Sequence, residues 1–224
     1  MATPIGNLED ITLRALRTLR ECSVIAAEDT RRAGRLLRHF DIKKPLVSYH
    51  KFNEAQRSSQ LLQQLDNGDI IALISDAGTP GISDPGQRLT MEAHAAGHKV
   101  ESAPGPCALI TALSTSGMPT DQFHFIGFPP RKSGARRRML ESVASIPGTL
   151  VFYESPHRIT KLLAEMADLW PECPTFIGRE LTKKFEEHLM GNTSEIAAQF
   201  NKRKPKGEFV VLLGEPRIED VPVR

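Results

Sequence analysis

Several features that mark whole classes of protein are scarce or missing in this 224-residue sequence. Its three cysteines, Cys22, Cys107 and Cys173, show no CxxC spacing, which argues against a zinc knuckle, a redox pair or a disulfide framework. No apolar run approaches the ~20 residues that span a bilayer, and residues 1–10 lack the pattern of a signal peptide. We therefore expect a soluble protein of the reducing cytoplasm.

An excess of charge of one sign is also missing. Lysine and arginine number 29 and aspartate and glutamate 27, so the formal net charge is only +2. Such a balance produces no global field that would indicate a nucleic-acid or membrane partner, and any evidence of that kind must be local. The apolar fraction of 40% is sufficient for the core of one large domain or two small ones.

The common nucleotide and metal motifs are absent as well. Nothing matches GxxxxGK[ST], and no GxGxxG opens a helix after a strand, which disfavours P-loop NTPases and ordinary Rossmann dehydrogenases. The seven histidines form no HExxH or HxH cluster. We therefore expect no metal site.

Short apolar strands alternate with amphipathic segments along the whole chain, which predicts an α/β fold with a mostly parallel sheet. Residues 117–121 (GMPTD) combine glycine, proline and aspartate, as lobe boundaries do, and predict two α/β lobes, 1–117 and 118–224. We expect strands at 23–27, 46–49, 70–75, 99–102, 122–128, 149–153, 175–179 and 209–213. We expect helices at 8–19, 30–40, 54–65, 85–96, 106–116, 136–146 and 158–169.

Residues 75–86 (SDAGTPGISDPG) are the most informative stretch. Its glycines permit close approach of the backbone to a ligand, and Asp76 and Asp84 follow the carboxyl end of a strand, where open α/β sheets bind ligands. A second loop, APGP at 103–106, follows the next expected strand, and the two loops are expected to form a crevice. The alternative is a pair of ordinary turns, with Asp84 capping the next helix.

Two arginine-rich stretches offer local evidence of an anionic partner. EDTR at 28–31 enters an expected helix that also contains Arg32, Arg35 and Arg38; it is either an anionic-substrate edge or a solvated helix face capped by Asp29. The second stretch lies beside two prolines and a glycine, and its natural partner is a phosphate backbone. Its cations are Arg131, Lys132, Arg136, Arg137 and Arg138.

A family resemblance rests on eight motifs that occur in order between Thr3 and Leu213. They are TPIGNLED, AAEDTRR, SDAGTPGISDPG, APGPCA, GFPPRK, VFYESPHR, RELTKKFEE and KGEFVVLL. This set closely resembles the family of ribosomal RNA small subunit methyltransferase I, within the tetrapyrrole-methylase-like superfamily.

The resemblance implies a class III methyltransferase fold, with two α/β lobes and S-adenosylmethionine bound in the cleft between them. It also implies a homodimer that transfers a methyl group to the ribose 2′-hydroxyl of a cytidine in the decoding centre. The partner would be 16S rRNA, free or assembled in the 30S subunit.

Matched positions suggest the site residues. The donor would contact Asp76, Ala77, Gly78, Thr79, Pro104, Gly105, Pro106, Cys107 and Ala108 from the first lobe and Tyr153, Leu181 and Gly207 from the second. Candidates for the ribose side are Asn7, Asp29, Arg31, His50, Asn53 and Glu54. Asp29 or His50 would receive the proton, although His50 is equally well explained as a hydrogen-bonded strand-end residue. RNA would contact Arg31, Arg32, Arg35, Arg131, Lys132, Arg136, Arg137 and Arg138.

Two other readings stay open: a methylase of a tetrapyrrole or another small molecule, because fold does not fix substrate, and a non-catalytic ribosome-assembly factor. The basic loop favours RNA over a small molecule, and retention of SDAGTP and PGPCA favours catalysis. Two departures from the family bear on this. Its members have an apolar strand before TPIGN, whose loss would weaken the sheet and donor pocket, and many have a C-terminal helical appendage that would add RNA affinity.

Overall fold

The computed structural model describes residues 1–215 and contains two compact units, Met1–Cys107 and a second that begins at Ala108. Both units mix helices with a sheet, so the predicted α/β fold class is confirmed. The division lies before the expected boundary at 117/118 because helix α5, Ala108–Ser116, packs against strands of the second sheet.

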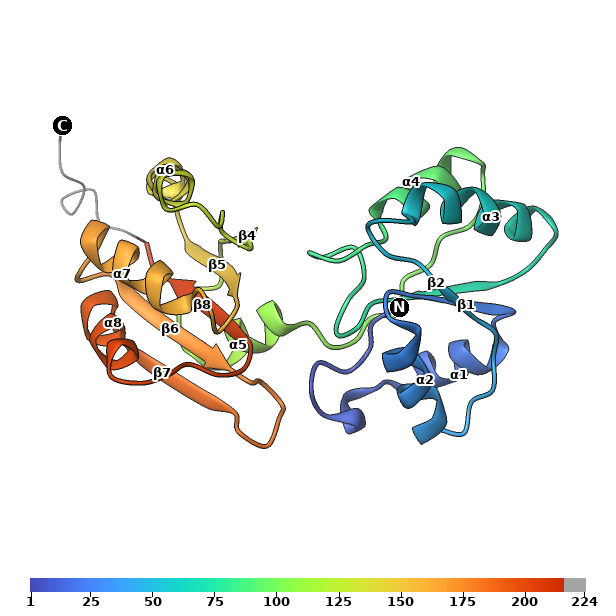
Figure 1. The fold of residues 1–224 in the computed structure, drawn as a ribbon, viewed down its shortest axis with the longest axis horizontal. Coiled ribbons are helices and arrows are strands. Elements are labelled where there is room, and N and C mark those ends of the chain that lie inside the picture. Colours follow the sequence, from blue (N-terminus) through green and yellow to red (C-terminus); the bar gives the residue numbers. More distant parts are fainter. Residues whose placement is uncertain (216–224) are drawn as a thin grey trace. The chain divides into compact units, whose positions relative to one another are not determined.

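The first unit is a three-stranded parallel sheet in the order β2-β1-β3. Figure 1 shows α1 and α2 on one face of this sheet and α3 and α4 on the other. Every residue of the central strand β1 is buried, as expected for a strand with helices on both faces. The elements are η1 (Leu8–Asp10), α1 (Leu13–Glu21), β1 (Val24–Ala27), α2 (Thr30–His39), β2 (Leu46–Ser48), α3 (Glu54–Asp66), β3 (Ile71–Ile74) and α4 (Gln87–Ala95).

The single helix expected at 8–19 is divided in two. Asn7 Oδ1 accepts a hydrogen bond from Glu9 N and caps the 3-10 helix η1. Thr12 Oγ1 accepts one from Ala15 N at 3.1 Å and caps α1. Each cap satisfies a backbone N–H that has no partner within its helix.

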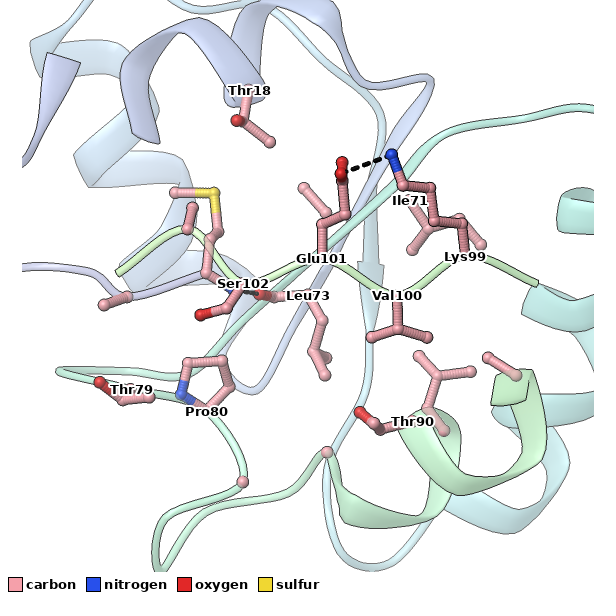
Figure 2. A pocket seen from close by; sticks show the side chains of 18 of the residues that line it. Thr18, Ile71, Leu73, Thr79, Pro80, Thr90, Lys99, Val100, Glu101 and Ser102 are labelled. Carbon is pink, nitrogen blue, oxygen red and sulfur yellow. Dashed lines mark hydrogen bonds and ion pairs between the residues drawn. The ribbon is translucent and has the colours of Figure 1, made fainter. Parts of the chain in front are cut away.

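The strand expected at 99–102 does not form. Residues 99–102 pair with no strand among residues 1–215, and a cavity of about 900 Å³ lies between them and β3. In Figure 2 the Lys99–Glu101 ion pair lies on the side of Thr18 of α1, whereas Val100 points toward Thr90 of α4. With no neighbouring strand in reach, the segment makes no ladder.

The first residues of the chain lie at one end of this cavity. The amino group of Met1 donates to Leu73 O at 2.8 Å, and Ala2 N donates to Ala103 O. Thr3 and Gly78 exchange two backbone hydrogen bonds of 2.9 Å. These bonds join the TPIGN motif to β3 and to the glycine-rich loop.

The second unit is a five-stranded sheet in the order β4-β5-β8-β6-β7. Among neighbouring strands of this sheet only β4 and β5 pair in parallel, and the other three pairs are antiparallel. The expectation of a mostly parallel sheet is therefore wrong for this unit. Strand β7 and helix α8 were not expected from the sequence. The elements are α5 (Ala108–Ser116), β4 (Phe123–Gly127), α6 (Ser133–Val143), β5 (Thr149–Glu154), α7 (Ile159–Leu169), β6 (Pro174–Arg179), β7 (Glu187–Asn192), α8 (Thr193–Asn201) and β8 (Phe209–Leu213).

Helices α7 and α8 pack together over this sheet and supply much of its core (Figure 1). Leu162, Met166 and Phe200 from the helices are buried against Phe152 and Val211 from the strands. Within residues 1–215, every helix is too short or too polar to span a lipid bilayer. The tail at 216–224 lies outside the described residues.

Candidate functional site

Three acidic residues follow the carboxyl ends of neighbouring strands in the first unit. Strands β1 and β3 are adjacent and parallel, so Glu28, Asp29 and Asp76 reach the same edge of the sheet. Asp29 N donates to Asp76 Oδ1 at 3.0 Å, and Asp76 N donates to Glu28 Oε2 at 3.5 Å. The structure therefore brings the predicted residues Asp29 and Asp76 together and adds Glu28.

The carboxylates at this edge repel one another. Burial raises the pKa of Asp84 to about 6, and the charges of Glu28 and Asp76 contribute to the rise. Burial and the charge of Asp76 also raise the pKa of Glu28. A cationic ligand bound here would relieve this repulsion. S-adenosylmethionine, with its ammonium and sulfonium groups, matches that requirement.

Asp29 has a structural role at the start of α2. Its Oδ1 accepts from Arg31 N at 2.8 Å, and its two oxygens accept from Arg31 Nε and Nη2 at 3.1 and 2.7 Å. These hydrogen bonds from Arg31 hold the pKa of Asp29 well below its usual range. A carboxylate that holds protons so weakly is a poor general base, so the geometry favours the capping interpretation of Asp29.

His50 lies in the turn after β2. Its backbone N donates to Asn53 Oδ1 at 2.8 Å. Its side chain is close enough to Glu28 for the two to interact electrostatically. Among residues 1–215, its buried Nδ1 has no hydrogen-bond partner. The interpretation of His50 as a fully hydrogen-bonded strand-end residue therefore lacks support at this atom, and His50 remains our candidate for the ribose side.

The two loops predicted to form the donor-binding crevice are in contact. Thr79 Oγ1 donates to Pro106 O at 3.2 Å, which joins the loop that contains Ala77 to the one that contains Pro104 and Cys107. Gly78 has a φ of +77°, and a Cβ on it would lie 3.3 Å from Ile5 Cγ2 and 3.7 Å from Pro106 O. A side chain there would be strained, so glycine is required where these loops meet.

The second unit places three predicted donor contacts at one edge of its own sheet. Tyr153 lies on β5, next to β8, and its hydroxyl accepts from Leu109 N of α5 at 3.1 Å. Leu181 is buried after β6, and Gly207 lies just before β8. Strands β6 and β8 are paired, so these two turns are neighbours. Gly207 has a φ of +91°, and a Cβ on it would collide with Glu180.

Arg136 does not belong to an RNA-binding surface, contrary to the expectation. It is 2% exposed, and its Nε and Nη2 donate to the two carboxylate oxygens of Glu165 at 2.7 and 2.6 Å. Its Nη1 donates to the carbonyls of Pro130 and Arg131. Every donor group is used inside the protein, so Arg136 orders the basic loop rather than contacting phosphates.

The other predicted cations divide into paired and unpaired groups. Arg31 is paired with Asp29, Arg32 lies 3.3 Å from Asp76 Oδ2, and Arg137 contacts Glu141 and Asp168. The remaining cations are exposed, and none forms an ion pair within the described part of the chain. They are Arg35, Arg131, Lys132 and Arg138.

Comparison with known proteins identifies the family. The model of the tetrapyrrole (corrin/porphyrin) methylases matches residues 2–197. The chain is 48% identical to ribosomal RNA small subunit methyltransferase I of Micromonospora olivasterospora, over 96% of this chain and 69% of that protein. It is 46% identical to the protein of that name from Thermotoga maritima, over 95% and 96%.

The fold also matches a solved structure, uroporphyrin-III C-methyltransferase from Thermus thermophilus complexed with S-adenyl homocysteine. The TM-score is 0.63 at 22% identity, over 94% of this chain and 93% of that one. The chain therefore belongs to the tetrapyrrole methylase family, in the group of ribosomal RNA small subunit methyltransferase I proteins.

Proposed function

We propose that this methyltransferase, whose methyl donor is S-adenosylmethionine, modifies the ribose 2′-hydroxyl of cytidine 1402 in the 16S rRNA of the small ribosomal subunit. The observation that supports an RNA acceptor best is the 45–48% identity, over nearly the whole chain, to relatives named for ribosomal RNA. Ribosomal RNA as the substrate implies a cytoplasmic protein. The predicted homodimer is part of the proposal.

The strand-end loops of the first unit suit the donor. The carboxylates of Asp76 and Asp84 fit a ligand that carries positive charge, and the pKa of Asp84 is raised mainly by burial, with a contribution from the charges of Glu28 and Asp76. The bond from Thr79 to Pro106 holds the two loops together. When bound, the donor supplies an activated methyl group. Ala77, Gly78, Pro104, Gly105 and the other matched positions, including Tyr153, Leu181 and Gly207, stay predicted donor contacts.

Positioning of the ribose should dominate the chemistry, because the attacking oxygen and the methyl carbon must be in line. A group that takes up the hydroxyl proton would contribute further, and its pKa should be near the working pH. Asp29 does not meet this condition, whereas His50 lies at the same edge with an unsatisfied ring nitrogen. We propose His50 for this role.

Exposed cations supply the affinity for RNA in this proposal. Arg35 on α2 and Arg131, Lys132 and Arg138 around α6 are free of ion pairs within residues 1–215 and are able to contact phosphates. Each neutralised phosphate of a single strand contributes roughly 0.7 to the negative slope of log affinity against log salt concentration. A methylase of a small molecule should show almost no such dependence.

The experiment is a comparison of acceptors. Purified protein is incubated with tritiated S-adenosylmethionine and either unmodified small ribosomal subunits, free 16S rRNA or uroporphyrinogen III. We expect label in the subunit or its RNA and none in the tetrapyrrole, with Asp76→Ala as the inactive control. Label in the tetrapyrrole alone would establish the small-molecule reading. RNA binding with neither donor binding nor methyl transfer would support the assembly-factor reading.

A further inference from the structure

Phe52 is the most exposed large apolar side chain among the residues that the structure describes. It is 94% exposed, whereas Leu13, the next, is 86% exposed. Phenylalanine is usually buried, and a ring held almost entirely in water contributes nothing to the core of this unit. Its position therefore calls for a role outside folding.

The turn that presents Phe52 is held firmly by hydrogen bonds. Asn53 N and Glu54 N both donate to His50 O at 2.9 Å, and Asn53 Oδ1 accepts from His50 N at 2.8 Å. Asn53 Nδ2 donates to Ser48 O at 3.2 Å, which fixes the turn to the end of β2. Because the backbone of this turn is already ordered, little conformational entropy of the backbone would be lost when the ring binds a ligand.

The ring lies at the same edge of the sheet as the candidate site. Tyr49 N donates to Ala27 O at 2.8 Å, so the turn after β2 is adjacent to the end of β1, where Glu28 and the start of α2 follow. The ring of His50 lies 6.1 Å from that of Phe52, edge on at 66°. Lys51, beside Phe52 in the turn, is exposed and adds a cation.

We propose that Phe52 stacks on an unpaired nucleobase of the RNA that this edge of the sheet binds. The inference rests on the proposed function and specifies it further: the acceptor is single-stranded or locally opened where it is bound. Bases in an A-form duplex are stacked on each other, and proteins read them mainly where they are unpaired, on aromatic rings flanked by cations. Phe52, with Lys51 beside it, has this character.

The first test compares Phe52→Ala with Leu13→Ala, which removes an apolar side chain of similar exposure from α1. The probe is a fluorescein-labelled oligocytidine of about ten nucleotides, and anisotropy gives its Kd across a salt series. We expect Phe52→Ala to raise Kd at least about fivefold, since stacking on one base is worth about 1–3 kcal/mol. Its salt slope, donor affinity and Tm should match wild type, and Leu13→Ala should change none of these.

The second test places a reporter in the turn. The single tryptophan, Trp170, is 1% exposed in the second unit, so Phe52→Trp adds an exposed indole to a buried background. We expect oligocytidine to quench the added emission and a fully paired RNA hairpin to leave it unchanged. Phe52→Leu, which keeps an apolar side chain but no ring, should bind as weakly as Phe52→Ala.

The possible results test the stacking role of Phe52, the proposed function, or both. A Kd for Phe52→Ala within twofold of wild type, in a protein that binds RNA, would overturn the stacking role and leave the proposed function intact. Absence of RNA binding and methylation by the wild type would overturn both. A change of oligomeric state in Phe52→Ala with unchanged RNA affinity would also overturn the stacking role and assign the ring to contact with a second copy.

Discussion

Replacing Asp84 with asparagine should stabilise the protein at neutral and alkaline pH. The carboxyl group is half-buried in the glycine-rich loop, and burial together with Glu28 and Asp76 raises its pKa from 3.8 to about 6. Between these two values the folded protein holds a proton that the unfolded chain releases. The free energy of unfolding therefore falls as the pH rises through this window and stays low above it.

The magnitude follows from the size of the shift. A change from 3.8 to about 6 is about two pKa units, equivalent to about 3 kcal/mol at full ionisation. Asparagine keeps an oxygen that accepts a hydrogen bond, so the interaction between Asp84 and Ser75 has a substitute. The gain in Asp84→Asn should be about 2–3 kcal/mol above pH 7 and should vanish as the pH approaches 4.

Urea denaturation followed by far-UV circular dichroism, repeated from pH 4 to pH 8, measures this profile. Asp121→Asn is the matched control, because Asp121 is exposed and lies in the second unit. Hydrogen exchange of peptides from residues 1–107 would localise the gain to the first unit. An equal gain at pH 4.5 and pH 8, or no gain at pH 8, would refute the argument from repulsion among buried carboxylates.

Four further predictions concern the proposed site and the basic loop. Arg136→Ala should lower the free energy of unfolding by about 3–5 kcal/mol in chemical denaturation, because the partly buried carboxylate of Glu165 loses its ion-pair partner. A loss below 1 kcal/mol would contradict the structural role of Arg136 and favour the original prediction that it contacts RNA. Arg131→Ala combined with Arg138→Ala should leave Tm unchanged and reduce the RNA salt slope by about 1.4; an unchanged slope would remove both cations from the interface. Asp76→Ala should weaken S-adenosylmethionine binding in calorimetry at least about tenfold. Binding of S-adenosylmethionine to the wild type at pH 6 should release protons, because a bound cation lowers the pKa of Asp84, and the release is detected as a dependence of the binding heat on the ionisation enthalpy of the buffer. S-adenosylhomocysteine, which lacks the sulfonium charge, should release fewer protons.

The sequence predicts the first unit well where the signal is local. Strands β1, β2 and β3 are short apolar runs, and the acidic and glycine-rich segments that follow them reach one edge because parallel strands share it. The expected contact between the loops at 76–79 and 104–106 is also present, although no strand forms before the second loop. The expected strand at 99–102 does not form, because the sequence of so short a segment says nothing about whether a neighbouring strand is present.

The second unit shows what a local pattern misses. Strand β7, EHLMGN, is an edge strand with alternate residues in solvent, so it has no continuous apolar run. Helix α8 does have a signal, a capping box formed by Asn192 and Glu195, that would have located its start. Strand direction depends on the path of the connecting segments, so it cannot be predicted from the sequences of the strands alone.

Site residues were hardest to predict where a partner lies far away in the chain. Arg136 looks like its neighbours in the basic run, but Glu165 on α7 buries and pairs it. Asp29 and His50 look equally suitable as bases, and only the bonds from Arg31 to Asp29 separate them. Phe52 gave no signal at all, because an isolated phenylalanine in a sequence is expected to be in the core.

Methylation of the ribose of one cytidine in small-subunit rRNA, the function that we propose for this chain, can be tested directly. Unmodified small subunits are treated with the protein and S-adenosylmethionine, and the RNA is digested with nuclease and analysed by mass spectrometry. We expect a fragment from the decoding centre that contains one 2′-O-methylcytidine, at cytidine 1402, and that is missing with Asp76→Ala. A methyl group on a base, or on a ribose elsewhere in the RNA, would contradict the proposal.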